Sequence, residues 1–130
     1  MSGTMATSST RIDQYVTQWA TEKPEAEALV FGEQRYTWAE FEDAVDRCAR
    51  AFLDAGVEPG DRIGLVAMAC PEFMISYMAA ARVGAIWLGL SPKFTVDELR
   101  YILSDAQPTL LLTLRSYAGI DLVKHGLTFG

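Results

Sequence analysis

Apolar residues in the second half of this chain form short continuous runs separated by helical patterns. The runs at residues 63–67, 85–90 and 110–114 have the length and composition of buried strands. Helices are predicted between them, over residues 71–83, where a proline suits the first turn, and over 95–106, where apolar residues recur at helical spacing. Because helices alternate with strands, right-handed crossovers would build a parallel sheet. The pattern predicts an α/β fold with a partial doubly wound parallel sheet.

The first half of the chain predicts two more helices and a short N-terminal β-hairpin. Residues 28–31 and 35–37 flank a loop that contains a glycine, which is typical of a hairpin. Thr37 is followed three residues later by a glutamate, a capping box that begins a helix ending at Gly56. A helix is also predicted over residues 10–21, packed by its apolar face. That face carries Ile12, Tyr15, Val16 and Trp19.

The tryptophans and cysteines are interpreted as structural residues. Trp19, Trp38 and Trp87 each fall on a predicted buried face, so we expect core positions rather than stacking platforms for a ligand. Cys48 and Cys70 have no histidine or further cysteine at the spacing of a metal site. We expect two unpaired thiols rather than a disulfide, which fits the cytoplasm.

Length and charge narrow the class of protein. With 130 residues, half of them apolar, the chain is long enough for one domain with its own core. Its net charge of −6 disfavours nucleic acid and anionic lipid surfaces as partners. No apolar stretch reaches the roughly 20 residues of a membrane span. We predict a mobile leader at 1–9, an α/β domain at 10–117 and a tail at 118–130 whose role is open.

Short motifs along the chain resemble one known superfamily when they are taken together and in order. They are Tyr-Thr-Trp-Ala-Glu-Phe at 36–41, Gly-Val-Glu-Pro-Gly-Asp-Arg-Ile at 56–63, Pro-Glu-Phe at 71–73, Ala-Arg-Val-Gly-Ala-Ile at 81–86, Leu-Ser-Pro at 90–92 and Glu-Leu-Arg-Tyr-Ile-Leu at 98–103. Their order and spacing resemble the N-terminal subdomain of adenylate-forming enzymes. This superfamily includes acyl-CoA synthetases, aryl-CoA ligases, firefly luciferase and peptide-synthetase adenylation domains. The resemblance covers residues 12–113.

Three positions depart from the motifs that the family usually has. Ala69 and Ser91 stand where many members have asparagine, and Gly89 stands where proline is common. The sequence Trp-Leu-Gly-Leu at residues 87–90 resembles that of acyl-CoA synthetases acting on medium-chain, long-chain or aromatic acids more than that of peptide-synthetase domains. The resemblance implies a parent enzyme that uses ATP and Mg²⁺ to convert a carboxylic acid to an acyl-adenylate, and then CoA to form a thioester.

The groups that the family uses for this chemistry are not found in these residues. The resemblance implies a Ser/Thr/Gly-rich phosphate loop with a lysine, but Lys23, Lys93 and Lys124 follow no such loop. Residues 2–4, Ser-Gly-Thr, are interpreted as a chance likeness in the leader, and His125 as a tail residue without a catalytic partner. We therefore assign no catalytic or metal-binding residue and no cofactor to this segment, and expect the N-terminal fragment to be inactive alone.

Lys93 is the candidate binding residue. It follows the carboxyl end of a predicted strand and precedes the helix that Thr95 caps, where an anion would be favoured. In some acyl-CoA ligases that this sequence resembles, a basic residue at the matching position touches the phosphates of CoA. The alternative is a solvated loop lysine. Asp61 and Arg62 lie at the opposite end of a strand, so we interpret them as turn residues.

A second function class is a non-catalytic association module. Its partner would be the rest of a ligase chain, another protein, or a second copy of itself. The leucines at 110–112 and 114 would normally be covered by later parts of such a fold. We expect the isolated chain to self-associate, either by pairing strand edges or by exchanging an element between copies.

Overall fold

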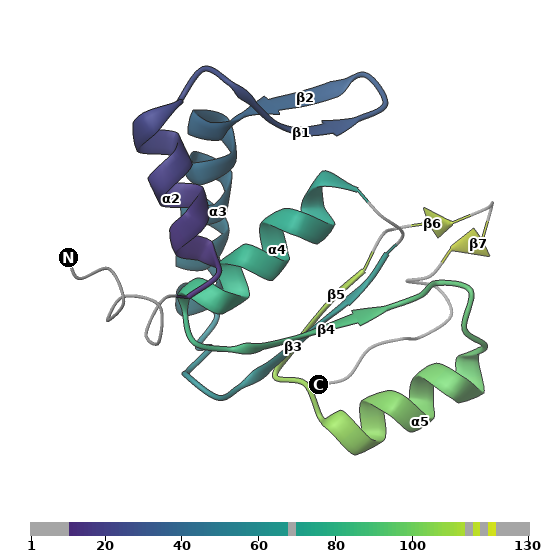
Figure 1. Cartoon of the computed structure of the whole chain (residues 1–130). Helices are drawn as coiled ribbons and strands as arrows, with labels where there is room; N and C mark the ends of the chain where they lie inside the picture. The colour runs from purple at the N-terminus through teal and green to yellow at the C-terminus, as the bar shows by residue number, and fades with distance from the viewer. Residues whose placement is uncertain (1–10, 68–69, 114–115, 118–119, 122–130) are drawn as a thin grey trace.

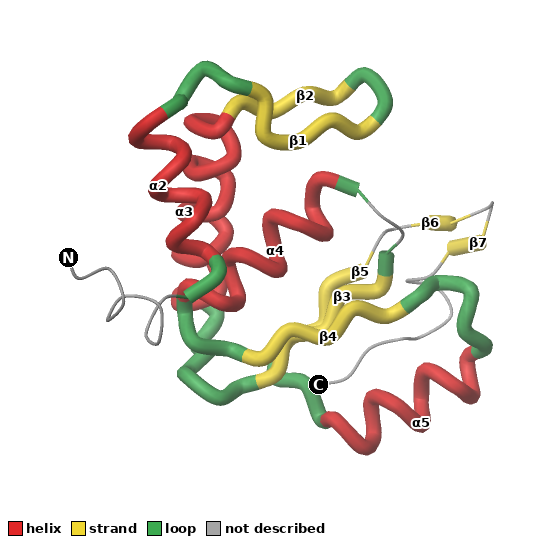
Figure 2. Tube along the Cα trace, viewed as in Figure 1, coloured by secondary structure: helices red, strands yellow, loops and turns green. Residues whose placement is uncertain are grey.

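The computed structural model describes residues 11–67, 70–113, 116–117 and 120–121 (Figures 1 and 2). Within this part of the chain, a helical and hairpin layer precedes a parallel sheet flanked by helices. The elements are α2 (Asp13–Glu22), β1 (Glu27–Phe31), β2 (Gln34–Thr37), α3 (Trp38–Asp54), β3 (Arg62–Val66), α4 (Pro71–Arg82), β4 (Ile86–Leu90), α5 (Val96–Ala106), β5 (Leu110–Thr113), β6 (Ser116–Tyr117) and β7 (Ile120–Asp121). The leader, Ala69, Leu114, Lys124 and His125 lie outside the described residues.

The predicted α/β fold and its parallel sheet are confirmed. The strands are ordered β4-β3-β5, and both outer strands run parallel to β3. Val66 at the end of β3 pairs with Leu90 on one side and Thr113 on the other. Figure 1 shows α4 on one face of the sheet and α5 on the opposite face. The carboxyl ends of three strands therefore meet at one edge.

Sequence reasoning overestimated the burial of the outer strands. β3 is buried along Ile63–Val66, but β4 and β5 lie at the sheet edges and are mostly half-buried. A continuous apolar run does not reveal whether a strand is central or at an edge. Each described leucine of β5 is half-buried: Leu110 and Leu112 pack toward α3 and α4, and Leu111 packs toward α5.

The capping box at Thr37 is confirmed and fixes the start of α3. Thr37 Oγ1 accepts a hydrogen bond from the Glu40 amide at 3.2 Å, and Glu40 Oε1 accepts one from the Thr37 amide at 2.8 Å. α3 packs against α4 and β3 around one apolar core. The side chains that α3 buries there are Phe41, Val45, Ala49 and Phe52. These side chains recur at helical spacing and form the core face of α3.

The predicted packing of the first helix is wrong in part. Val16 is buried, but Ile12, Tyr15 and Trp19 are 41%, 51% and 36% exposed. Trp19 instead stacks on Trp38, with ring centroids 6.0 Å apart. Periodicity missed the attachment of α2 because this depends on a polar residue: the Asp13 side chain is 1% exposed and pairs with Arg82 of α4.

The hairpin and the end of the described chain complete the fold. β1 and β2 pair antiparallel across a turn in which Gly32 has a φ of 61°, as the sequence predicts. β6 and β7 form a further antiparallel pair that sequence reasoning did not predict, because each strand has two residues. In the described part of the chain, no helix has both the length and the apolar character that crossing a membrane requires.

Candidate functional site

The loop after β4 carries Lys93 at the carboxyl edge of the sheet. Ser91 Oγ accepts a hydrogen bond from the Lys93 amide at 3.1 Å, and the Ser91 carbonyl accepts one from the Phe94 amide at 3.2 Å. The Ser91 hydroxyl therefore closes the turn in the way that an asparagine side chain does at such positions. Pro92 is buried, which anchors the loop while Lys93 stays exposed.

Helix α5 begins directly after this loop. Thr95 Oγ1 accepts from the Glu98 amide at 3.1 Å and Glu98 Oε1 accepts from the Thr95 amide at 3.2 Å, so the second capping box is confirmed. The first turn also contains Asp97. Among the residues that the structure describes, no carboxylate forms an ion pair with Lys93, whose ammonium group remains available to an anion.

An apolar pocket of about 270 Å³ opens at the same edge of the sheet, between the ends of β3 and β5 and under α3 and α4. It is lined by Cys48, Leu65, Ala67, Glu72, Ile75, Ser76, Leu112 and Thr113. Crevices between the carboxyl ends of parallel strands are the usual ligand sites of open α/β sheets. The sequence did not predict this pocket, because it depends on how α3, α4, β3 and β5 meet, and no motif signals that.

Cys48 and Ser76 in this pocket are poor nucleophiles. Burial raises the pKa of the Cys48 thiol, so it is protonated and weakly nucleophilic at neutral pH. Ser76 Oγ donates to the Phe73 carbonyl and accepts from Trp87 Nε1, both at 3.2 Å. The pKa of the Cys70 thiol is also raised, chiefly by burial. Both cysteines are free, as the sequence predicts.

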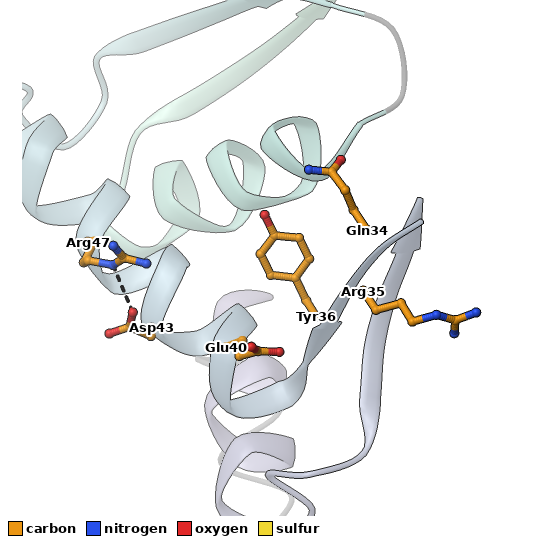
Figure 3. A pocket seen from close by; sticks show the side chains of 6 residues that line it. All are labelled: Gln34, Arg35, Tyr36, Glu40, Asp43 and Arg47. Atoms are coloured by element: carbon orange, nitrogen blue, oxygen red, sulfur yellow. Dashed lines mark ion pairs between the residues drawn. The ribbon is translucent and has the colours of Figure 1, made fainter. Parts of the chain in front are cut away.

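A second, more polar groove of about 480 Å³ lies between the hairpin and α3 (Figure 3). It is lined by Gln34, Arg35, Tyr36, Glu40, Asp43 and Arg47. Arg47 Nε pairs with Asp43 at 2.9 Å, and Arg35 reaches away from Tyr36 to pair with Glu27 at 2.7 Å. Glu40 is held in the capping box. Since its charged side chains already have partners, this groove offers weak binding to a further charged ligand.

Asp61 and Arg62, at the opposite end of the sheet, make structural contacts, as expected for turn residues. Asp61 Oδ2 accepts from the Glu58 amide at 2.8 Å, and Arg62 Nη1 donates to the Ala106 carbonyl at 3.1 Å. Across residues 11–67, 70–113 and the short β6–β7 pair, no cluster of three or more metal-ligating side chains is found. At the carboxyl edge of the sheet, the structure therefore places Lys93 and the apolar pocket between β3 and β5.

Comparison with known proteins identifies the family. A family model described as AMP-binding enzyme matches residues 16–127. The chain belongs to this family, as the motifs at residues 36–103 predict. The model match covers both the hairpin layer and the parallel sheet, so the two layers belong to one family fold.

Solved structures of related enzymes share the fold. The N-terminal domain of FACL13 from Mycobacterium tuberculosis matches with a TM-score of 0.76 and 28% identity, over 79% of this chain and 26% of that one. Mycobacterium tuberculosis fatty acyl CoA synthetase matches with a TM-score of 0.76 and 25% identity, over 85% of this chain and 24% of that one. The described fold is thus the N-terminal portion of the adenylate-forming fold.

Curated relatives include both acyl-CoA ligases and peptide synthetases. Acyl-CoA ligase sidI of Aspergillus fumigatus is 42% identical over 77 residues, covering 59% of this chain and 13% of that protein. Acyl-CoA ligase SID4 of Ajellomyces capsulatus is 36% identical over 98 residues, covering 75% and 17%. Malpinin synthetase of Mortierella alpina is 33% identical over 95 residues, covering 73% and 1%. This chain spans at most 17% of the length of these relatives.

Proposed function

We propose that this chain is the N-terminal part of an AMP-forming acyl-CoA ligase that activates a medium-chain, long-chain or aromatic acid. The family match over residues 16–127 carries the proposal, because it shows an AMP-binding enzyme. The two fungal acyl-CoA ligases, at 42% and 36% identity, support CoA as the acceptor of the acyl group. The free thiols of Cys48 and Cys70 support the cytoplasm as its location.

Within this function, the chain supplies scaffold and one contact to CoA. Lys93 extends from the loop at the carboxyl edge of the sheet, and its ammonium group would bind a phosphate of CoA as a point charge. ATP and Mg²⁺ would be held by residues elsewhere in the ligase, because the lysines of this segment follow no glycine-rich loop. For the same reason we propose that the 130 residues alone form no acyl-adenylate.

The test uses the complete ligase that contains this segment. We expect it to release pyrophosphate from ATP in the presence of the acid and to form a thioester with CoA. Lys93→Glu should raise the KM for CoA by about tenfold or more, because a charge-assisted contact is replaced by repulsion, while pyrophosphate release is unchanged. Lys23→Glu is the matched control, since the Lys23 ammonium lies 5.6 Å from the centre of the Trp19 ring and away from the carboxyl edge.

The outcomes separate the two parts of the proposal. Equal loss of adenylate formation and thioester formation in Lys93→Glu would contradict the CoA contact. An enzyme that forms the adenylate but transfers the acyl group to a carrier domain and never to free CoA would contradict the ligase assignment.

A non-catalytic association module is the second candidate. It is favoured by the sheet order β4-β3-β5, because the outer edges of β4 and β5 are paired with no other strand in the described part of the chain. Open strand edges are templates for pairing with another chain. The partner would be the remainder of the ligase or a second copy of this chain.

A further inference from the structure

Helix α2 is attached to α3 and α4 by a cluster of charged groups, together with Val16 and the stack of Trp19 on Trp38. Of its predicted apolar face, Val16 alone is buried, at 2% exposure, whereas Ile12, Tyr15 and Trp19 are each more than one third exposed. The other fully buried side chain of α2 is Asp13, at 1% exposure. Apolar burial on this helix is therefore small for an element of ten residues.

The guanidinium group of Arg82 lies at the centre of the attachment. Its Nε donates to Asp13 Oδ2 at 2.8 Å and its Nη2 donates to Thr17 Oγ1 at 2.9 Å, both on α2. Its Nη1 and Nη2 also donate to the two carboxylate oxygens of Glu42 on α3, at 3.0 and 2.8 Å. One side chain of α4 thus joins α2 to α3.

Neighbouring groups complete this cluster. Arg11, just ahead of α2, donates to both oxygens of Asp13 at 2.8 and 3.3 Å, and Thr17 Oγ1 donates to Glu42 Oε1 at 2.9 Å. The Arg82 side chain is 15% exposed. In the part of the chain that the structure describes, every buried side-chain nitrogen and oxygen has a hydrogen-bond partner. Charge-assisted bonds with so little contact to water are strong and weakly screened.

We propose that α2 is an electrostatic latch, which is released from α3 and α4 in a local step when the contact between Asp13 and Arg82 is lost. Val16 of α2 packs in the same core as Phe41, Val45 and Phe52, and the part of this core between α3, α4 and β3 would stay formed after release. Local release of an element with few buried apolar contacts is a general property of protein structures. This proposal does not depend on the proposed ligase function.

Acid should open the latch. Burial by itself raises the pKa of Asp13, but its hydrogen bonds and charge interactions with Arg11 and Arg82 outweigh burial and hold the pKa below its usual range. A lowered pKa means that the attachment is fully present above the pKa of the released carboxyl and is lost as the pH falls through the pKa of the attached one. Glu42 and Asp46 of α3 also face Arg82 in this cluster.

The test is native-state hydrogen exchange of the 130-residue chain, read by mass spectrometry of peptides from α2 and β3. In Asp13→Asn, the amides of residues 13–22 should exchange at least about tenfold faster, while those of β3 change less than about twofold. Asp43→Asn is the matched control, because Asp43 pairs with Arg47 at 2.9 Å with both side chains more than half exposed. It should leave both peptides unchanged.

Other outcomes would overturn the latch. If the α2 and β3 amides accelerate together, or if Asp13→Asn abolishes folding while Asp43→Asn folds, α2 is part of the global core. Unchanged exchange in α2 would show that the charge contact does not hold it. In the unsubstituted chain, lowering the pH below the ordinary range of aspartate should reduce the protection factors of the α2 amides, which correct for slower intrinsic exchange in acid, before those of β3. Simultaneous loss of protection in α2 and β3 would contradict the proposal.

Discussion

The indole ring of Trp87 lies against the backbone of Gly89, two residues further along β4. A Cβ added to Gly89 would lie 2.7 and 2.8 Å from two ring carbons of Trp87, which is too close for any side chain. The ring is fixed by Phe73, whose ring centroid is 4.6 Å away, and by the bond from its Nε1 to Ser76 Oγ. The departure of Gly89 from the usual proline thus has a physical reason.

This pairing predicts a non-additive effect on stability. Gly89→Ala should lower the free energy of unfolding by about 1–3 kcal/mol, because the indole must leave its preferred position. In a Trp87→Phe background, which lacks the two crowded ring carbons, the same substitution should cost clearly less. Urea denaturation of the four chains measures the coupling. Equal costs in both backgrounds would show that the ring moves away freely.

Single residues also mark where sequence reasoning failed. Free Cys48 and Cys70 were predictable, because neither has a metal-ligating neighbour at the required spacing. The burial of Asp13 and Arg82 was not predictable, because a periodicity argument assigns charged residues to the solvent side. Their burial depends on two helices meeting, and residues 69 positions apart carry no local signal of it.

At the scale of elements, local chemistry predicted the helices that begin with capping boxes. At Thr37 and Thr95, the hydroxyl accepts a hydrogen bond from the glutamate amide and the threonine amide donates one to the glutamate side chain, as expected. These bonds were predictable because they join residues three positions apart. α2 lacks a side-chain cap at Ile12, and its orientation was the least predictable. The hairpin and the crossovers followed from glycine positions and from strand spacing. The position of each strand within the sheet could not be predicted, because central and edge strands have the same sequence periodicity.

The capping box of α3 supports a stability prediction. Thr37→Ala should lower the free energy of unfolding by about 1 kcal/mol, because the Glu40 amide loses its acceptor at the start of the helix. Thr37→Ser keeps the hydroxyl group and should retain most of the stability. Thr21→Ala is a second control, since the Thr21 hydroxyl bonds within α2 at an exposed site. Urea denaturation monitored by circular dichroism measures the free energy of unfolding of each variant and so checks this order of stabilities. A Thr37→Ala chain as stable as the Thr37→Ser chain would contradict the role of the cap.

At the scale of the whole molecule, the sheet order leaves β4 and β5 as outer strands. Ile86 at the start of β4 is 48% exposed. The sequence predicted the parallel sheet, but the candidate site at its carboxyl edge was predictable only through Lys93, which follows a strand directly. The neighbouring apolar pocket depends on the packing of α3 and α4 against β3 and β5.

The open edges predict self-association of the isolated chain. Analytical ultracentrifugation at micromolar concentration should show species larger than the monomer. Ile86→Lys should reduce this association, because a charged side chain on an edge strand opposes pairing with another chain. Tyr101→Lys is the control and should leave association unchanged, because Tyr101 is 76% exposed on α5 and lies outside the strand edges. A monodisperse monomer would exclude pairing through strand edges.

The position of β3 in the centre of the sheet has a consequence for folding. β3 is completed before either neighbour is synthesised, and Ile63 pairs with Trp87 of β4 and with Leu110 of β5. On the ribosome, the most buried strand of the sheet must therefore remain unpaired until β4 and β5 have been synthesised. Helices α3 and α4 can shield one face of β3 early, but the other face stays uncovered until α5 arrives. Chaperone binding during synthesis would be concentrated on this strand.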